Sequence, residues 1–323
     1  MHAAANSLRG GVSPWGTRRL RGQSTLEYVL ITTVIGLVVV FAGPQAAGVI
    51  RNQFGAVTET LDEGTTENAF KDAVDVPDPE NGTAFAVYSA ADDSLMFYKR
   101  RGVPQVGDMF NDRCVSEVYT GFEMDKYVSL NGDIWGNWYL HEPNTPWRSI
   151  RNAVRIVKVI DSGIAPASID YWFYQMKNLS SIDVQKLDTS RCSDFFLTFG
   201  CCNSLTSIDV SNWSTQSLTK LNGTFLACKS LKSLNLGGWE TSNVVSFHCL
   251  FDNCPAMSDS AMQAAVYQLE ITEKATDFGL MFEYCDKLNL DCSNWSVRAD
   301  AYHDRFNYDA PGVILPKAWQ QRE

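Results

Sequence analysis

Aromatic and aliphatic residues recur at intervals of 26 positions through the second half of the chain. Phe173, Phe199, Phe225 and Phe251 mark this interval, and a degenerate copy begins at Phe282. Other columns keep fixed offsets from the phenylalanines: Cys202, Cys228, Cys254 and Cys285, then Leu179, Leu205 and Leu231, then Trp213 and Trp239. Because so many apolar positions share one period, the sequence predicts a solenoid in which stacked repeats bury these side chains together.

Each repeat also contains a short alternating segment, I-x-V or L-x-L, which is typical of a strand with one buried face. Its outward positions carry Ser181, Ser207 and Ser233, and then Asp183, Asp209 and Asn235. These short polar side chains lack the Tyr, Trp and Arg that dominate binding hot spots. We therefore expect the strand face to be a solvated wall. The less regular loops and the aromatic segment 130–147 are the better candidates for a binding surface.

The region 83–160 has the pattern of short strands separated by turns. TAFAVYS and SLMFYK flank Ala91-Asp92-Asp93 and predict a β-hairpin, and VRIVKVI (154–160) predicts a further strand. Trp135, Trp138 and Trp147 could form a carbohydrate platform, but tryptophans of a β-rich domain are more often core residues. Residues 258–275, between two repeats, predict a helical insertion.

The repeat pattern F-x-x-C-x-x-L-x-x-I-D-V-x-x-W-x-T resembles the BspA-like leucine-rich repeats of bacterial surface proteins. The preceding β-rich stretch and the opening segment Tyr171-Trp172-Phe173 are similar to that family as well. The resemblance covers residues 83–297. It implies a surface-exposed, non-enzymatic protein with a role in adhesion or protein–protein contact, whose partner is an unknown extracellular protein or host ligand.

The N-terminal part has a different pattern. From Tyr28 to Ile50 there are 23 residues without a charge, enough for a helix to cross a hydrocarbon core of about 30 Å. A cleaved secretory signal has a shorter apolar core, so the length favours a membrane helix that is retained. Arg18, Arg19 and Arg21 precede the segment, which predicts a cytoplasmic N-terminus and an extracellular remainder.

The stretch Gly22-Gln23-Ser24-Thr25-Leu26-Glu27-Tyr28 resembles the signature of Flp (Tad, type IVb) pilins. In that family a prepilin peptidase cuts after the glycine, so the resemblance implies processing between Gly22 and Gln23. It also implies that Glu27 and Tyr28 take part in pilin assembly, with Glu27 pairing with the new amino terminus of a neighbouring subunit. Flp pilins are much shorter than this chain. A minor pilin or assembly component of a Tad-like pilus is therefore the alternative function.

Charge and cysteine content limit the partners and reactions that the sequence can support. Four of the 27 basic residues lie in residues 1–22, which contain no acid, and all 37 acidic residues follow. An acidic body argues against nucleic acid as a partner, since phosphate binding requires Lys and Arg.

We interpret the four repeat cysteines as small buried hydrophobes, with disulfides between neighbouring repeats as the alternative. No Cys-x-x-Cys pair, nucleophile elbow, phosphate loop or zinc-protease helix occurs. We expect no metal, no cofactor and no enzymatic activity.

These patterns predict an α+β fold with a single N-terminal membrane helix, a small β-rich domain and a short leucine-rich-repeat solenoid. The expected divisions are a basic leader (1–22), a pilin-like transmembrane helix (23–62), an acidic linker (63–81), the β-rich domain (82–160), the repeats (161–300) and a C-terminal tail (301–323). The expected location is the cell membrane, in a single pass, or a pilus. The expected partners are the membrane, prepilin peptidase, other pilin subunits and the unknown extracellular or host ligand.

Overall fold

The computed structural model describes residues 76–128, 141–258 and 260–320. They belong to one compact unit, Asn68–Glu323. Its N-terminal part is a five-stranded sheet with the strand order β5-β1-β2-β6-β7. The strands are β1 (Thr83–Ser89), β2 (Ser94–Arg100), β5 (Glu117–Thr120), β6 (Ile156–Val159) and β7 (Ser181–Asp183).

The predicted hairpin is confirmed, since β1 and β2 pair antiparallel over their full length. Asp93 in the turn between them has a φ of 54°, a conformation that aspartate tolerates better than most residues. Both faces of the hairpin are buried. Ala86 and Phe97 join the main core, whereas Phe85 and Tyr98 join a second, smaller cluster on the opposite face. Near-continuous burial explains why TAFAVYS and SLMFYK are apolar on both faces.

The sheet continues from the hairpin into the repeats. β6 pairs in parallel with β2 on one side and with β7 on the other, where Val157 lies opposite Ile182. β6 is shorter than the predicted strand 154–160, and Lys158 within it is exposed. Aromatic packing spans the same junction, because Phe97 of β2 stacks on Trp172 with ring centroids 5.4 Å apart. The β-rich region and the repeats therefore share one sheet and one core.

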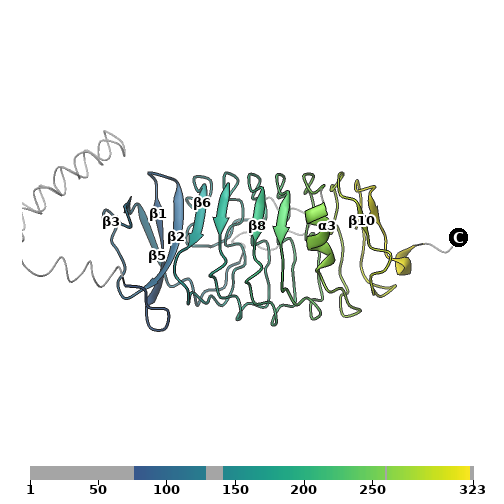
Figure 1. Cartoon of the computed structure of the whole chain (residues 1–323), viewed down its shortest axis with the longest axis horizontal. Helices are drawn as coiled ribbons and strands as arrows, with labels where there is room; N and C mark the ends of the chain where they lie inside the picture. Colours follow the sequence, from purple (N-terminus) through teal and green to yellow (C-terminus); the bar gives the residue numbers. More distant parts are fainter. Residues whose placement is uncertain (1–75, 129–140, 259, 321–323) are drawn as a thin grey trace, which may run out of the picture. The chain divides into compact units, whose positions relative to one another are not determined.

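Beyond β7 the chain forms successive coils that lie side by side (Figure 1). β8 (Ser207–Asp209) and β9 (Ser233–Asn235) pair in parallel, and Ile208 lies opposite Leu234, 26 positions later. A second column of parallel bridges joins the coils along another face. It runs through Asp194, Lys220, Ser246, Asp277 and Tyr302. The coils that carry β8 and β9 are thus tied to each other at two places.

The remaining elements are short. β3 (Met109–Phe110) pairs with β4 (Arg113–Cys114), and β10 (Leu290–Asp291) pairs with β11 (Val313–Ile314). Helix α3 (Ser260–Tyr267) lies within the predicted helical insertion and covers only part of it. A 3-10 turn, η2 (Lys317–Trp319), follows the last strand.

Each coil turns at two corners where the backbone has a positive φ. The first corners are Tyr171, Leu197, Gly223, Cys249, Leu280 and Arg305, and the second corners are Gln175, Cys201, Ala227, Asn253, Tyr284 and Asp309. Such left-handed conformations are uncommon outside glycine. Corner amides donate to the next coil, as Leu197 N does to Asn222 O at 3.0 Å and Cys201 N to Leu226 O at 2.7 Å. These bonds offset the cost of the corners and hold adjacent coils in register.

The interior is organised in columns with their own hydrogen bonds. The repeat phenylalanines stack, and the rings of Phe199 and Phe225 are 5.6 Å apart at an interplanar angle of 4°. The Cys228 thiol donates to Phe199 O at 3.2 Å, and the Trp239 indole Nε1 donates to Val210 O at 2.9 Å. Interior carbonyl groups of one coil are therefore satisfied by side-chain donors of the next.

The predicted fold class is wrong for the part of the chain that the structure describes. These residues contain one α-helix, α3, and otherwise consist mainly of short strands and turns. The coils are closed by left-handed corners and β-bridges, in contrast to the α+β leucine-rich-repeat solenoid that the sequence predicted. The repeat pattern records which positions are buried, and this alone does not distinguish between the two ways of closing a coil.

The predicted single-pass location in the cell membrane is also wrong. Among residues 76–128, 141–258 and 260–320, no helix has the length and apolar character needed to span a bilayer. The segment that prompted the prediction, 23–62, lies outside the described residues together with the leader 1–22.

Candidate functional site

Most residues singled out from the sequence lie in the core of the stack. Exposure is 0% for Phe173, Phe199, Phe225, Phe251, Phe282, Cys202, Cys228, Cys254, Cys285, Leu179, Leu205 and Leu231. Trp213 and Trp239 are also buried. The four column cysteines are thiols, and burial raises the pKa of each, to about 12 in Cys285. They act as packing groups and weak donors, and burial leaves them unreactive.

The other candidates from the sequence lie elsewhere. Gly22, Gln23, Glu27 and Tyr28 are outside the described residues, and so are Trp135 and Trp138 of the aromatic segment. Trp147, from the same segment, is a core residue with 1% exposure. Its indole Nε1 donates to Trp172 O at 2.6 Å. Trp147 is thus unavailable as a carbohydrate platform.

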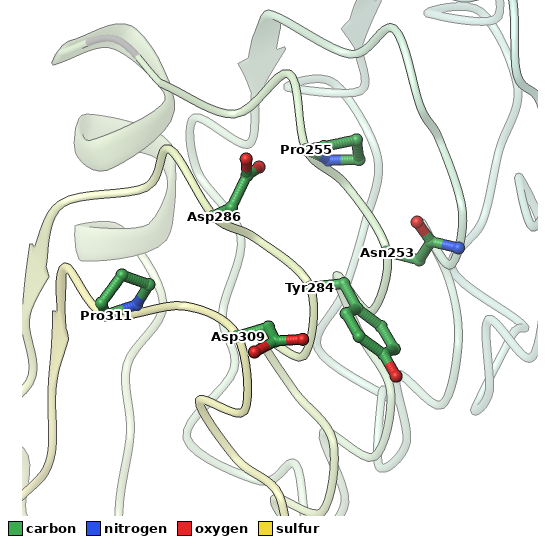
Figure 2. A pocket seen from close by; sticks show the side chains of 6 residues that line it. All are labelled: Asn253, Pro255, Tyr284, Asp286, Asp309 and Pro311. Atoms are coloured by element: carbon green, nitrogen blue, oxygen red, sulfur yellow. The ribbon is translucent and has the colours of Figure 1, made fainter.

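A pocket of about 650 Å³ opens on the last coils of the stack (Figure 2). It is lined by Asn253, Pro255, Tyr284, Asp286, Asp309 and Pro311. Three of these are second corners of successive coils, and the other three follow a corner by two positions. Because equivalent positions of stacked coils line up, the six side chains surround one opening, as Figure 2 shows.

Exposed aromatic rings flank this pocket. Tyr284 is 41% exposed and Tyr308 is 50% exposed, and their rings meet edge to face with centroids 5.8 Å apart. Arg305 joins them, because its Nη2 donates to Tyr284 Oη at 3.3 Å and its guanidinium lies 4.6 Å from the Tyr308 ring centroid. Tyrosine and arginine are the residues that most often dominate binding energy at interfaces.

Two buried carboxyl groups lie behind the pocket wall. Asp252 and Glu283 directly precede Asn253 and Tyr284, and Glu283 forms an ion pair with Arg305. Burial, together with the negative charge of Glu283, raises the pKa of Asp252 to about 7, and Arg305 opposes the shift. Burial also raises the pKa of Glu283. The charge behind the pocket therefore depends on pH near neutrality.

A second charged cluster lies along the bridge column. Burial raises the pKa values of Asp170 and Asp194, and the negative charge of Asp170 raises the pKa of Asp194 as well. Further along, Asp277 accepts from Ser246 Oγ at 3.3 Å and contacts His248 Nδ1 at 3.0 Å. In a hydrolase triad the histidine lies between serine and aspartate, but here the aspartate occupies the middle position. Within the described ranges, no group of three or more His, Cys, Asp or Glu side chains is placed to hold a metal ion.

The sequence analysis directed attention to the less regular loops but did not identify the pocket. Counting two and four positions from each repeat phenylalanine would have found Asn253 and Pro255, then Tyr284 and Asp286. The two lining residues of the third coil, Asp309 and Pro311, could not be found in this way, because that coil lacks the F-x-x-C pattern. The α3 insertion also separates two of the contributing coils along the chain.

Residues 167–295 and 270–311 match the protein family described as "Mycoplasma protein of unknown function, DUF285". The match covers less than half of the chain and includes every pocket residue. It supports the resemblance to BspA-like surface proteins, and hence a surface-associated protein of unknown function. It does not extend to Gly22–Tyr28 and gives no support to a pilin-like segment. No curated protein and no solved structure matches the chain.

Proposed function

We propose that this chain is a non-enzymatic contact protein whose stacked coils present the pocket at Tyr284 to a partner, in adhesion or in protein–protein contact. The family match supports the surface association. The single observation that carries the contact role is the pocket, where exposed Tyr284 and Tyr308 lie beside Arg305. The strand face of the preceding coils offers short polar residues such as Ser207 and Ser233.

The backbone around the pocket is suited to a preformed site. Asn253 N donates to Glu283 O at 2.7 Å, and Tyr284 N donates to Tyr308 O at 2.8 Å. Asn253 and Tyr284 are thus each fixed by the coil that follows. A site that is ordered before binding loses less conformational entropy in the complex, which favours affinity.

Site-directed photo-cross-linking in intact producing cells tests the contact role. A photoreactive residue at Pro311, on the pocket rim, is expected to give a discrete cross-linked adduct. The same residue at Ser233, on the strand face, is the matched control and is expected to give none. Equal yields at both positions, or no adduct at Pro311, would contradict the proposed function.

The alternative, a minor pilin or assembly component of a Tad-like pilus, is supported only by the sequence Gly22–Tyr28. Its partners would be prepilin peptidase and other pilin subunits. Mass spectrometry of the cellular protein tests it directly: Gln23 as the first residue supports pilin processing, and an intact Met1 rejects it.

A further inference from the structure

The pocket contains two carboxylates without a partner of opposite charge. Asp286 and Asp309 are exposed and come from adjacent coils. In the described part of the chain, neither forms an ion pair. Arg305 is engaged elsewhere, with Glu283 and the two tyrosines. Two like charges beside one opening repel each other, and an incoming cation would relieve that repulsion.

The uncharged part of the lining suits the same kind of ligand. Figure 2 shows Asp309 beside Tyr284, with Asp286 farther from the ring. An aromatic face attracts a cation held near its centre. Pro255 and Pro311 supply apolar walls and bring no side-chain donors that would compete for the carboxylates. The hydrocarbon stem of a long basic side chain would pack against such walls.

At the positions equivalent to the pocket lining, the earlier coils carry residues of a different kind. The negative charge of the pocket is therefore a local feature. At the positions equivalent to Pro255, Asp286 and Pro311, the first three coils carry Lys177, Asn203 and Lys229. The corner positions of those coils are Gln175, Cys201 and Ala227, all buried. The acidic and aromatic character is therefore confined to the last coils, where the pocket lies.

We propose that this pocket binds a cationic side chain, arginine or lysine, from an extended segment of a partner protein. Arginine suits this lining best, because a guanidinium offers both a planar face for an aromatic ring and several donors for carboxylates. This inference rests on the proposed contact function and specifies its ligand chemistry. A neutral oligosaccharide would use the tyrosine but would leave both carboxylates uncompensated, so the charge of the pocket favours the basic ligand.

Binding of a fluorescein-labelled peptide, Gly-Ser-Arg-Gly-Arg-Gly-Ser, to the full chain tests the inference by fluorescence anisotropy. Citrulline in place of both arginines gives an uncharged peptide of the same shape. Replacing both carboxylates, Asp286→Asn with Asp309→Asn, is expected to weaken binding of the arginine peptide about tenfold or more, because the charge-assisted hydrogen bonds from the guanidinium are lost. Tyr284→Leu is expected to weaken it by about two- to fivefold.

A second double variant controls for net charge. Glu240→Gln with Glu273→Gln removes two exposed carboxylates outside the pocket and is expected to change affinity by less than about twofold. Equal loss in the two double variants, or equal binding of the citrulline peptide, would overturn the inference. Binding of a neutral oligosaccharide probe, chitohexaose, that survives the Asp286→Asn and Asp309→Asn changes would overturn it as well.

The result separates the ligand chemistry from the contact role. If the cross-linked adduct at Pro311 persists after Asp286→Asn with Asp309→Asn, the contact function stands and the cationic ligand is rejected. If the wild-type chain gives no adduct at Pro311, the contact function itself is rejected. Loss of both the adduct and peptide binding in the pocket variant, with the Glu240→Gln and Glu273→Gln control unchanged, supports both.

Discussion

The repeat cysteines show why one residue type is suited to an interior column. Each thiol reaches a phenylalanine carbonyl of the preceding coil, as Cys228 Sγ does to Phe199 O at 3.2 Å and Cys254 Sγ to Phe225 O at 3.1 Å. A buried carbonyl without a donor is costly. Cysteine provides a weak donor in a small, otherwise hydrophobic side chain that fits beside a stacked ring. The column therefore serves both packing and hydrogen bonding.

Substitutions at Cys228 separate these two contributions. Cys228→Ala removes the donor and leaves a small void, so we expect a loss of about 2 kcal/mol in the free energy of unfolding. Cys228→Ser keeps a donor for Phe199 O and should cost less than alanine. Urea unfolding followed by circular dichroism measures both. If serine were more destabilising than alanine, the cost of burying the polar hydroxyl would outweigh the hydrogen bond.

Asp252 makes stability depend on pH. Its pKa is about 7 in the folded chain against an ordinary value of 3.8, mainly because it is buried, and also because Glu283 is close. Between these two values the folded state keeps a proton that the unfolded state has released. Stability therefore decreases as pH rises through this window, by up to about 4 kcal/mol from this group alone.

Asp252→Asn should flatten that dependence, because an amide does not titrate. We expect the variant to lose less stability than the wild type between pH 4.5 and 7.5. Free energies of unfolding in urea at four pH values across this range measure the difference. The pKa values of Asp170 and Asp194 are also raised, but these groups are present in both proteins, so their effect on the pH dependence of stability cancels in the comparison. Parallel curves for the two proteins would show that Asp252 is not the group responsible.

At the scale of elements, the corners define the coil more than the strands do. The strands have three residues or fewer in each coil after β7, whereas every coil has two left-handed corners. Gly223, at a first corner, has a φ of 61°, and a Cβ built there would lie 2.6 Å from Leu197 Cδ2. Gly238 has a φ of 84° outside the corner columns, and a Cβ there would meet nothing closer than Ser211 O at 3.7 Å.

These two glycines separate backbone strain from packing. Gly238→Ala should cost about 1 kcal/mol in stability, which is the conformational penalty alone. Gly223→Ala adds a clash against a buried leucine, so we expect about 2–4 kcal/mol. Urea denaturation midpoints at an unchanged slope measure both. Equal costs would mean that Leu197 moves aside and that the close approach is unimportant.

The 26-residue period could be predicted from the sequence because the same position of each coil is buried and therefore carries the same type of apolar residue. The columns of Phe199 and Cys202 are examples. The corners were not readable, since residues such as Leu197, Cys201 and Tyr284 give no sign of a positive φ. In this fold the hydrogen bonds between coils impose the positive φ, and the residue types at the corners have no local preference for it. The fold class was missed for this reason. The pocket was missed because it combines three coils, one of which departs from the repeat pattern.

At the scale of the whole described unit, the hairpin and the coils are continuous. The sequence divides this part into a β-rich domain at 82–160 and repeats at 161–300. Strand β6, from the first division, pairs with β2 on one side and with β7, from the second, on the other. Arg100, at the end of β2, forms a buried ion pair with Asp161, which follows β6, at 2.8 Å. Its guanidinium also lies 4.8 Å from the ring centroid of Tyr98. Contacts of this kind couple the first strands to the stack.

We therefore expect the hairpin and the coils to unfold together when this junction is weakened. Arg100→Met leaves Asp161 charged and buried, at a cost of about 3–5 kcal/mol. Arg155→Met is the matched control, because its ion pair with Asp93 is largely exposed and contributes about 1 kcal/mol at most. Hydrogen exchange read by mass spectrometry should show protection falling by the same free energy in β1–β2 and in β8–β9 for Arg100→Met. If protection fell only in β1–β2, the two regions would be separate folding units despite their shared sheet.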